Sequence, residues 1–203
     1  MDELKHIKNA LISVYHKDGL DELLALLHRE GVRLLSTGGT QQYIESLGYP
    51  CAKVEDLTGY PSILGGRVKT LHPKVFGGIL ARQNFSDDQA DMAAYAIAPI
   101  DLVIVDLYPF EDTVAQQASE SEIVEKIDIG GISLIRAAAK NFRDVVIIPS
   151  KAQYNTLKQL LVSRGANTTL ADRQALAEEA FAVSSHYDTA ICQWFSTLNK
   201  STK

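Results

Sequence analysis

Along the chain, continuous apolar runs rich in β-branched residues alternate with segments whose apolar positions recur every three or four residues. Residues 10–14 form the first apolar run and predict a buried strand, and residues 19–30, whose leucines share one face, predict a helix. A second strand is expected at 32–36 and a second helix at 38–48, where the last glycine suits a C-cap. This alternation is typical of parallel strands joined by crossover helices.

The strongest strand pattern lies in the middle of the chain. Residues 101–107 are almost continuously apolar, as in a strand buried on both faces, and residues 144–149 repeat that pattern. Between them, two short helical patterns occupy 121–127 and 132–141. The glycine pair at 130–131 is expected to separate them at a turn.

Two more helices are expected at the C-terminal end. One covers residues 152–164, and a longer one covers 170–195. Apolar residues in the longer helix recur at steps of three and four, so one stripe of it should be buried in the core or in a subunit contact. The stripe consists of Leu176, Ala180, Val183, Tyr187, Ile191 and Trp194. The economical reading is one α/β domain with a helical C-terminal extension.

Composition narrows the class of protein. The chain has 203 residues, 46% of them hydrophobic and 22% charged, so it can bury a substantial core and is too apolar to be disordered. A formal net charge of −5 argues against a nucleic-acid partner, because neutralising a phosphate backbone requires a basic face. No apolar run approaches the roughly 20 residues that span a bilayer. With an acidic start unlike a signal peptide, these features predict a cytoplasmic protein that binds no membrane.

The two cysteines carry little chemistry. Cys51 and Cys192 lie far apart and outside any Cys-x-x-Cys pattern. They predict buried or half-buried thiols rather than a disulfide framework or a zinc site, and no bound metal is expected.

One window reverses the overall charge. Residues 57–86 contain no Asp or Glu, hold four cationic residues and carry five of the 13 glycines. The cations are Arg67, Lys69, Lys74 and Arg82. This composition predicts an ordered loop that brings backbone N–H groups and cations close to an anion, although a solvated basic surface loop is the alternative. His72, next to Pro73, is expected to place the loop rather than to take part in chemistry.

A second candidate is the sequence STGGT at residues 36–40, which follows a strand and opens a helix. Free N–H groups and the positive helix end can form a phosphate cradle there, although a plain helix cap is the alternative. In a parallel sheet this turn lies at the carboxyl edge of the strands, where ligands bind. The same edge should receive Ser13 and Lys17 after the first strand, and Asp106 and Tyr108 after the strand at 101–107.

A third cluster surrounds the glycine pair. Asp128 precedes Gly130 and Gly131, and Arg136 and Lys140 follow. Asp128 and Lys140 meet only through a ligand or through tertiary folding. The alternative makes Asp128 a helix N-cap and Lys140 a surface lysine.

Taken together, these motifs resemble the inosine monophosphate (IMP) cyclohydrolase domain of the bifunctional AICAR transformylase/IMP cyclohydrolase family. They are Ser13-Val14 with Lys17, STGGT at 36–40, GGRVKTLHPKVFGGILAR at 65–82, DLYPF at 106–110, IDIGG at 127–131 and RAAAKN at 136–141. The resemblance implies a three-layer, methylglyoxal-synthase-like α/β fold, with a mostly parallel central sheet and helices on both faces. It also implies closure of formyl-AICAR (FAICAR), a purine ribotide, to IMP with loss of water, without a cofactor.

Site residues carry over by motif position. The resemblance implies a catalytic set of Lys69, Tyr108, Asp128 and Lys140. It implies substrate-holding groups at Ser13, Lys17, Thr37, Gly38, Gly39, Thr40, Arg67, Thr70, Asp106, Gly130 and Gly131. Our hypothesis is that Lys69 and Tyr108 handle the proton on the substrate nitrogen, while Lys140, paired with Asp128, donates toward the formyl oxygen.

The resemblance also implies a domain organisation. We expect residues 1–203 to form a single cyclohydrolase domain, with a core at about 8–150 and a helical extension at about 151–198. The sequence holds no counterpart of the family's longer transformylase domain, as expected either for a stand-alone cyclohydrolase or for a chain cut at the linker. The family suggests a homodimer, and the C-terminal stripe that ends at Phe195 is one possible contact surface.

The sequence departs from the family pattern in two places. Tyr15 and His16 stand where the family commonly has Ser and Asp, and Asp106 stands where it has Asn. If Asp106 faces the ligand, a donor is lost and an anion is gained, which a nearby cation has to pair. Two other functions on the same fold stay open at this point, a regulatory nucleotide-binding module and a methylglyoxal synthase.

Overall fold

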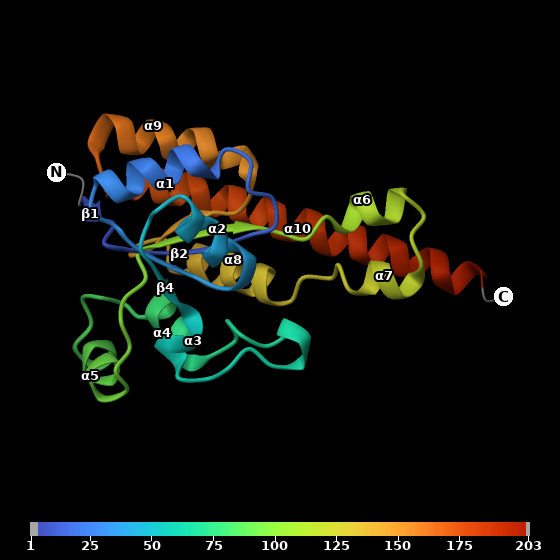
Figure 1. The fold of residues 1–203 in the computed structure, drawn as a ribbon, viewed down its shortest axis with the longest axis horizontal. Coiled ribbons are helices and arrows are strands. Elements are labelled where there is room, and N and C mark those ends of the chain that lie inside the picture. Colours follow the sequence, from blue (N-terminus) through green and yellow to red (C-terminus); the bar gives the residue numbers. More distant parts are fainter. Residues whose placement is uncertain (1–3, 202–203) are drawn as a thin grey trace.

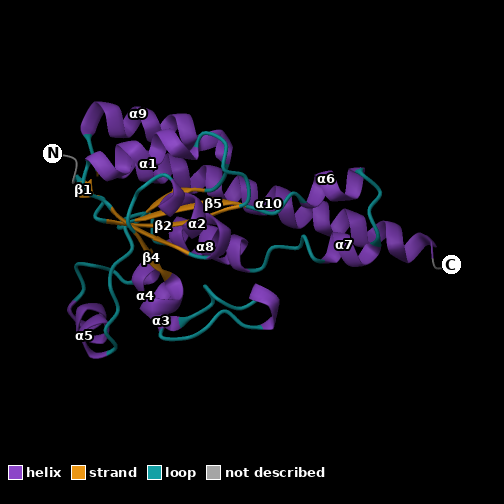
Figure 2. Ribbon diagram, viewed as in Figure 1, coloured by secondary structure: helices purple, strands orange, loops and turns teal. Residues whose placement is uncertain are grey.

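A five-stranded parallel sheet forms the centre of the molecule, as the alternating pattern predicts (Figure 2). The computed structural model describes residues 4–201. In spatial order the strands are β4 (Cys51–Lys53), β3 (Arg33–Ser36), β2 (Asn9–Val14), β5 (Leu102–Asp106) and β6 (Val146–Ile148). Four of these five are the predicted strands. The pattern does not reveal β4, because it has only three residues and lies partly exposed at the sheet edge.

The direction of the crossovers decides which face of the sheet each helix covers. The chain crosses from β2 to β4 in one direction through α1 (Leu20–Arg29) and α2 (Gly38–Ser46), then reverses to reach β5 and β6. Because parallel crossovers are right-handed, the reversal moves α4 (Pro73–Leu80) and α8 (Gly130–Lys140) to the opposite face. There α8 packs on β5 and β6, and α4 packs against α8. The sheet lies between helical layers, which confirms the predicted three-layer α/β fold.

Two helices follow the sheet. The first, α9 (Tyr154–Arg164), packs against α1, and the second, α10 (Leu170–Ser201), packs against α8 and β6. Figure 1 shows α10 running far beyond the sheet, with α6 (Phe110–Ala115) and α7 (Glu120–Val124) flanking its projecting part. The predicted helices at 152–164 and 170–195 are therefore present, and the second is longer than the pattern indicates.

A second, smaller core holds this projection together. It consists of Phe110, Ile123, Tyr187 and Trp194, each of which is almost completely buried. Phe110 makes edge-to-face contacts with both Tyr187 and Trp194. Most of the predicted apolar stripe of this helix is thus buried within this chain. Phe195, by contrast, stays exposed on the helix surface.

Short elements complete the described part of the chain. They are a two-stranded antiparallel ribbon of β1 (Lys5–His6) and β7 (Asn167–Thr168), the helices α3 (Val54–Thr58) and α5 (Ser86–Ala94), and the 3₁₀ turns η1 (Leu64–Gly66) and η2 (Lys151–Gln153). These elements have two to nine residues each, so periodicity alone does not detect them. No helix within residues 4–201 is both long enough and apolar enough to cross a membrane.

Residues 57–86 do not form one continuous loop, so the prediction made from their composition is wrong in this respect. Its second half contains α4, which starts with Pro73 at the first helical position and is capped by His72, whose Nδ1 accepts from the Lys74 N–H at 3.2 Å. His72 therefore places this segment, as expected, by ending the loop and starting a helix.

Packing explains the glycines of α4. A Cβ built on Gly77 would lie 2.9 Å from the Ile97 side chain, and one on Gly78 would lie 2.5 Å from the Ala98 carbonyl oxygen. These glycines permit close approach between α4 and the segment leading into β5, so their density does not indicate loop structure here.

The glycine pair at 130–131 also differs from expectation. It forms the first turn of α8 instead of a turn between two helices. The residues before it, 125–129, leave the helical pattern and run along the site described below. The break between the two predicted helices therefore lies before the glycines.

We predict that Gly78→Ala destabilises the protein by about 2 kcal/mol, because the added methyl meets a backbone oxygen that has no room to move. Urea unfolding measures the change. Gly39→Ala is the matched control, since nothing lies within 4 Å of a Cβ at that position. Equal stability of the two variants would contradict this account of the packing.

Candidate functional site

A cavity of about 750 Å³ opens at the carboxyl edge of the sheet. Its walls come from the loop after β2, the β3–α2 turn, the loop around Lys69, the end of β5 and the segment 124–131. The parallel register explains this meeting point, because Ile12 lies beside both Ser36 and Ile104, and Val14 lies beside Asp106. Of the 15 predicted site residues, all except Gly38 and Lys140 line the cavity.

The β3–α2 turn supplies the expected cradle. Thr37 is extended, Gly38 has a φ of +54°, and no side chain caps the N–H groups of the first turn of α2. The two hydroxyls of this turn are already occupied. Thr40 Oγ1 donates to the Val14 carbonyl at 2.9 Å, and Thr37 Oγ1 donates to Glu55 at 3.2 Å. The turn therefore offers backbone N–H groups to an anion, while Thr40 fastens α2 to β2.

The loop after β2 brings a cation to the same end. Lys17 Nζ donates to the backbone carbonyls of Val14 and Tyr15, which hold the side chain against the loop. Partial burial lowers the pKa of Lys17, and the charge of Asp106 opposes that shift. An anion bound beside Lys17 would, like the Asp106 charge, favour the protonated form of the lysine.

Both departures from the family pattern meet in one contact. Asp106 Oδ2 accepts from the His16 backbone N–H at 2.8 Å, and the His16 ring Nδ1 lies 2.8 Å from the same oxygen. The carboxylate gained at Asp106 therefore lies in hydrogen-bond contact with a residue that also departs from the pattern. Through these contacts the carboxylate holds the loop that carries Tyr15 and Lys17, and Asp106 also lines the cavity.

Asp128 is the most constrained group of the site. Its Oδ1 accepts from the Gly131 N–H at 2.6 Å, and the Tyr108 backbone also donates to the carboxylate. A Cβ on Gly131 would lie 2.6 Å from Asp128 Oδ2, so only glycine leaves room for the carboxylate. Burial raises the pKa of Asp128, although the two backbone donors and the nearby Lys69 charge oppose that shift.

The helical extension supports Asp128 from behind. The Tyr187 hydroxyl of α10 donates to the Lys126 carbonyl at 3.0 Å and accepts from the Asp128 N–H at 2.7 Å. Burial raises the pKa of Tyr187 to about 12, so the hydroxyl remains a donor at neutral pH. Tyr187 is a positioning residue that the stripe pattern identifies only as core.

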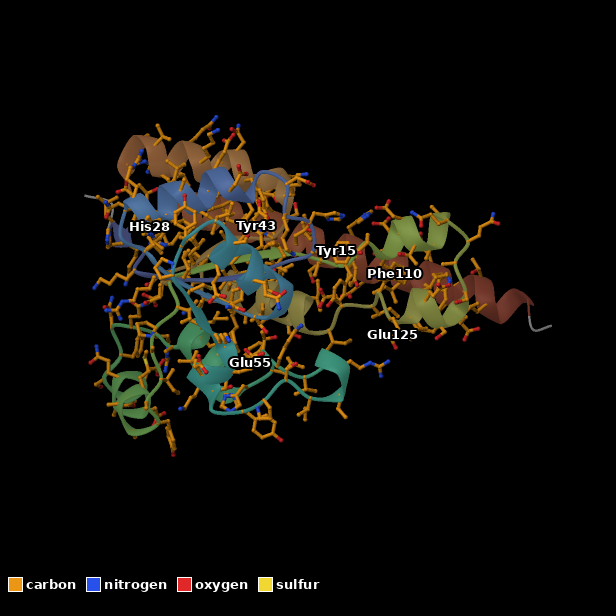
Figure 3. The ribbon with its side chains drawn as sticks, in the orientation of Figure 1. Tyr15, His28, Tyr43, Glu55, Phe110 and Glu125 are labelled. Carbon is orange, nitrogen blue, oxygen red and sulfur yellow. The ribbon has the colours of Figure 1, made fainter. Side chains whose placement is uncertain are left out.

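The basic loop faces the segment 124–131 across the cavity. Thr70 Oγ1 lies 3.2 Å from the position of a Cβ on Gly130, and Arg67 forms an ion pair with Glu125. Figure 3 shows Glu125 on the α7 side of the molecule. Lys69 lies close enough to Asp128 to affect its pKa. Desolvation is the main cause that raises the pKa of Tyr108, and the negative charge of Asp128 adds to it.

Lys140 does not join this cluster. It ends α8 and is exposed, whereas the cavity contacts Gly130 at the start of that helix. Ten residues at about 1.5 Å per residue separate the two positions by roughly 15 Å. The cation whose charge acts on the Asp128 pKa is Lys69, and within residues 4–201 the expected pairing of Lys140 with Asp128 is not formed.

The sequence motifs did not identify three features of the cavity. They are the ring of Tyr15, the ammonium of Lys126 and the ion pair of Glu125 with Arg67. Tyr15 stands out in the sequence only as a departure, and Lys126 adjoins the IDIGG motif without belonging to it. Across the described residues, no group of three or more His, Cys, Asp or Glu side chains is arranged to hold a metal ion.

The amino-acid sequence matches two known family models. Residues 19–133 match the family model described as MGS-like domain, which covers more than half of the chain. The chain belongs to the MGS-like domain family. Residues 138–203, which follow the MGS-like match, correspond to the family described as AICARFT/IMPCHase bienzyme. The match to the MGS-like family includes every cavity-lining residue from Gly39 to Gly131.

Nearly the whole length of this chain is similar to proteins of known identity. It is 65% identical over 195 residues to the bifunctional purine biosynthesis protein PurH of Bacteroides thetaiotaomicron, and 50% identical over 191 residues to PurH of Thermosynechococcus vestitus. It spans only 38% and 37% of those relatives. The solved structure of ForH is 36% identical, with a TM-score of 0.76, and the similarity covers 93% of this chain and 99% of ForH.

The raised pKa of Asp128 predicts how stability depends on pH. Above both its folded and unfolded pKa the carboxylate is charged in both states, so its burial costs stability, and this cost disappears as the pH falls below the unfolded value. Asp128→Asn should therefore unfold at an equal or higher temperature than the wild type at pH 8, with a smaller difference at pH 3.5, below the unfolded pKa of about 3.9. Thermal unfolding at both values checks this. A variant that is less stable by the same margin at both pH values would contradict it.

Proposed function

We propose that this chain is an IMP cyclohydrolase, which closes the ring of FAICAR to give IMP and water in purine biosynthesis. The observation that carries the proposal is a single cavity with an anion-binding end at Lys17 and the α2 turn, and an acid–base cluster of Lys69, Tyr108 and Asp128. The match of residues 138–203 to the bienzyme family and the identity to PurH proteins support it.

The reaction suits a site without a cofactor. The carboxamide nitrogen attacks the formyl carbon of the same molecule, a C–N bond forms, and the formyl oxygen becomes the hydroxyl of a carbinolamine. That hydroxyl takes up a proton and leaves as water, and the former formamide nitrogen loses its proton, so a C=N bond forms while the carboxamide nitrogen keeps its remaining proton. Because both reacting groups are already joined, holding them face to face is equivalent to an effective concentration of roughly 10⁵ M or more. The residues then have to move protons and stabilise charge on oxygen.

We assign these roles to three residues. Asp128, with its raised pKa, and Lys69, whose charge lies nearby, can exchange a proton with the substrate nitrogen or with the departing oxygen. The Tyr108 hydroxyl has its pKa raised by desolvation, so it is protonated at neutral pH and can donate to the formyl oxygen. Lys140 has no part in this proposal, because it lies at the far end of α8.

The phosphate of the ribotide belongs at the opposite end. Backbone N–H groups at the start of α2 and the Lys17 ammonium offer donors and positive charge there. In this proposal the dianion binds beside Lys17 rather than beside Lys69. Dimerisation, a cytoplasmic location and the organisation of residues 1–203 as a single domain stay predictions.

The direct test is to incubate the purified protein with FAICAR and follow the absorbance of IMP. The wild type should produce IMP, and Lys69→Met should lower kcat by about 10²-fold or more, in the range of a lost acid–base group. Lys53→Met is the matched control, because Lys53 is exposed on β4 outside the cavity. Dihydroxyacetone phosphate, the substrate of the methylglyoxal synthase alternative, should give no product.

Two outcomes would overturn the proposal. One is a wild-type protein that leaves FAICAR unchanged, and the other is a Lys69→Met variant that closes the ring at the wild-type rate. Turnover of neither substrate would favour the regulatory nucleotide-binding alternative.

A further inference from the structure

A cluster of two tyrosines and a lysine lies in the cavity beside the acid–base groups. The Lys126 Nζ atom is 5.2 Å from the Tyr15 ring centroid and 5.8 Å from that of Tyr108. The two rings meet edge to face, with centroids 5.5 Å apart and an interplanar angle of 85°. All three side chains line the cavity, and Tyr15 is marked in Figure 3 where the sheet gives way to the α6–α7 projection.

The backbone fixes the position of this lysine. The Lys126 carbonyl accepts from the buried Tyr187 hydroxyl, and its N–H donates to the Ile123 carbonyl at 3.0 Å. The same hydroxyl holds Asp128, so Lys126 and the acid–base cluster are anchored as one unit. The Lys126 side chain therefore projects from a rigid segment rather than from a free loop.

The ammonium is available to a ligand. The neighbouring carboxylate, Glu125, is already paired with Arg67, and within residues 4–201 no ion pair of Lys126 is present. Aromatic faces attract a cation but accept none of its protons in strong hydrogen bonds, so the three N–H donors of Lys126 remain usable.

The ring surfaces are equally available. Tyr15 is 40% exposed and Tyr108 is 39% exposed, and Ile129, which lines the same cavity, is 59% exposed. Exposed aromatic and aliphatic surface inside a cavity favours a flat, partly apolar ligand group. A donor-rich cation beside that surface favours a ligand group with an oxygen acceptor.

We propose that Tyr15 and Lys126 recognise the heterocycle of the ribotide. The ring packs against Tyr15, and Lys126 donates to the carboxamide oxygen of the substrate, which becomes the ring carbonyl of the product. This inference rests on the proposed function and adds two specificity-determining residues to it. The ring end is thereby read separately from the phosphate end at Lys17.

The test compares two probes, IMP and ribose 5-phosphate, which has the phosphate and sugar but no base. Isothermal titration calorimetry should show that Lys126→Met weakens IMP binding by about tenfold, as expected for loss of a charged hydrogen bond. Its affinity for ribose 5-phosphate should stay within about twofold of the wild type. Tyr15→Ser should give the same pattern through loss of ring contact.

Two variants keep the experiment interpretable. Lys17→Met should weaken both probes, because Lys17 lies at the phosphate end, and Lys126→Gln should repeat the Lys126→Met result if the charge is the active property. Circular dichroism establishes that each variant is folded.

The outcomes separate the two proposals. Absence of IMP binding by the wild type would overturn the proposed function and this inference with it. Wild-type binding of IMP, with Lys126 variants that bind both probes normally or lose both equally, would overturn this inference alone. Equal loss would mean that Lys126 acts only through its charge on the phosphate.

Discussion

The Tyr187 hydroxyl is the contact on which the rest of the site depends. It donates to the Lys126 carbonyl and accepts from the Asp128 N–H, so one buried group fixes both ends of a three-residue span. That span carries Asp128, the proposed acid–base carboxylate, and Lys126, the proposed ring-recognition lysine. Because burial raises the pKa of Tyr187 to about 12, the hydroxyl keeps its proton and both hydrogen bonds at neutral pH.

Through this contact the helical extension supports the wall of the site. α10 reaches the segment 124–131 only because its projecting half packs with Phe110 and Ile123 in a separate core. Its first half is fastened by the buried Arg173, which donates to the carbonyls of Phe142 and Thr168. The sheet edge supplies the end of the cavity where we propose that phosphate binds, and α10 holds the segment that carries Asp128. The helical extension therefore supports the part of the cavity wall that carries Asp128.

Periodicity predicted the long elements, because strands such as β2 and β5 are buried on both faces and α1 places its leucines on one face. Motif position predicted most cavity residues, since parallel strands end at a common edge. Position along a motif does not give distance in space, and Lys140 shows the difference, because α8 carries it about 15 Å from Gly130. The glycines of α4 led to a wrong prediction of loop structure, because their role also depends on the tertiary fold. Their role is to permit close packing against Ile97 and Ala98, which depends on tertiary contacts.

The most direct test of this account is the effect of Tyr187→Phe on FAICAR closure. The variant keeps the ring and loses only the hydroxyl, so kcat should fall by about tenfold or more while the circular dichroism spectrum stays unchanged. Phe195→Leu, on the exposed surface of α10, is the control and should retain wild-type kcat. If Tyr187→Phe is folded and closes FAICAR at the wild-type rate, α10 does not position the acid–base segment and the central claim is wrong.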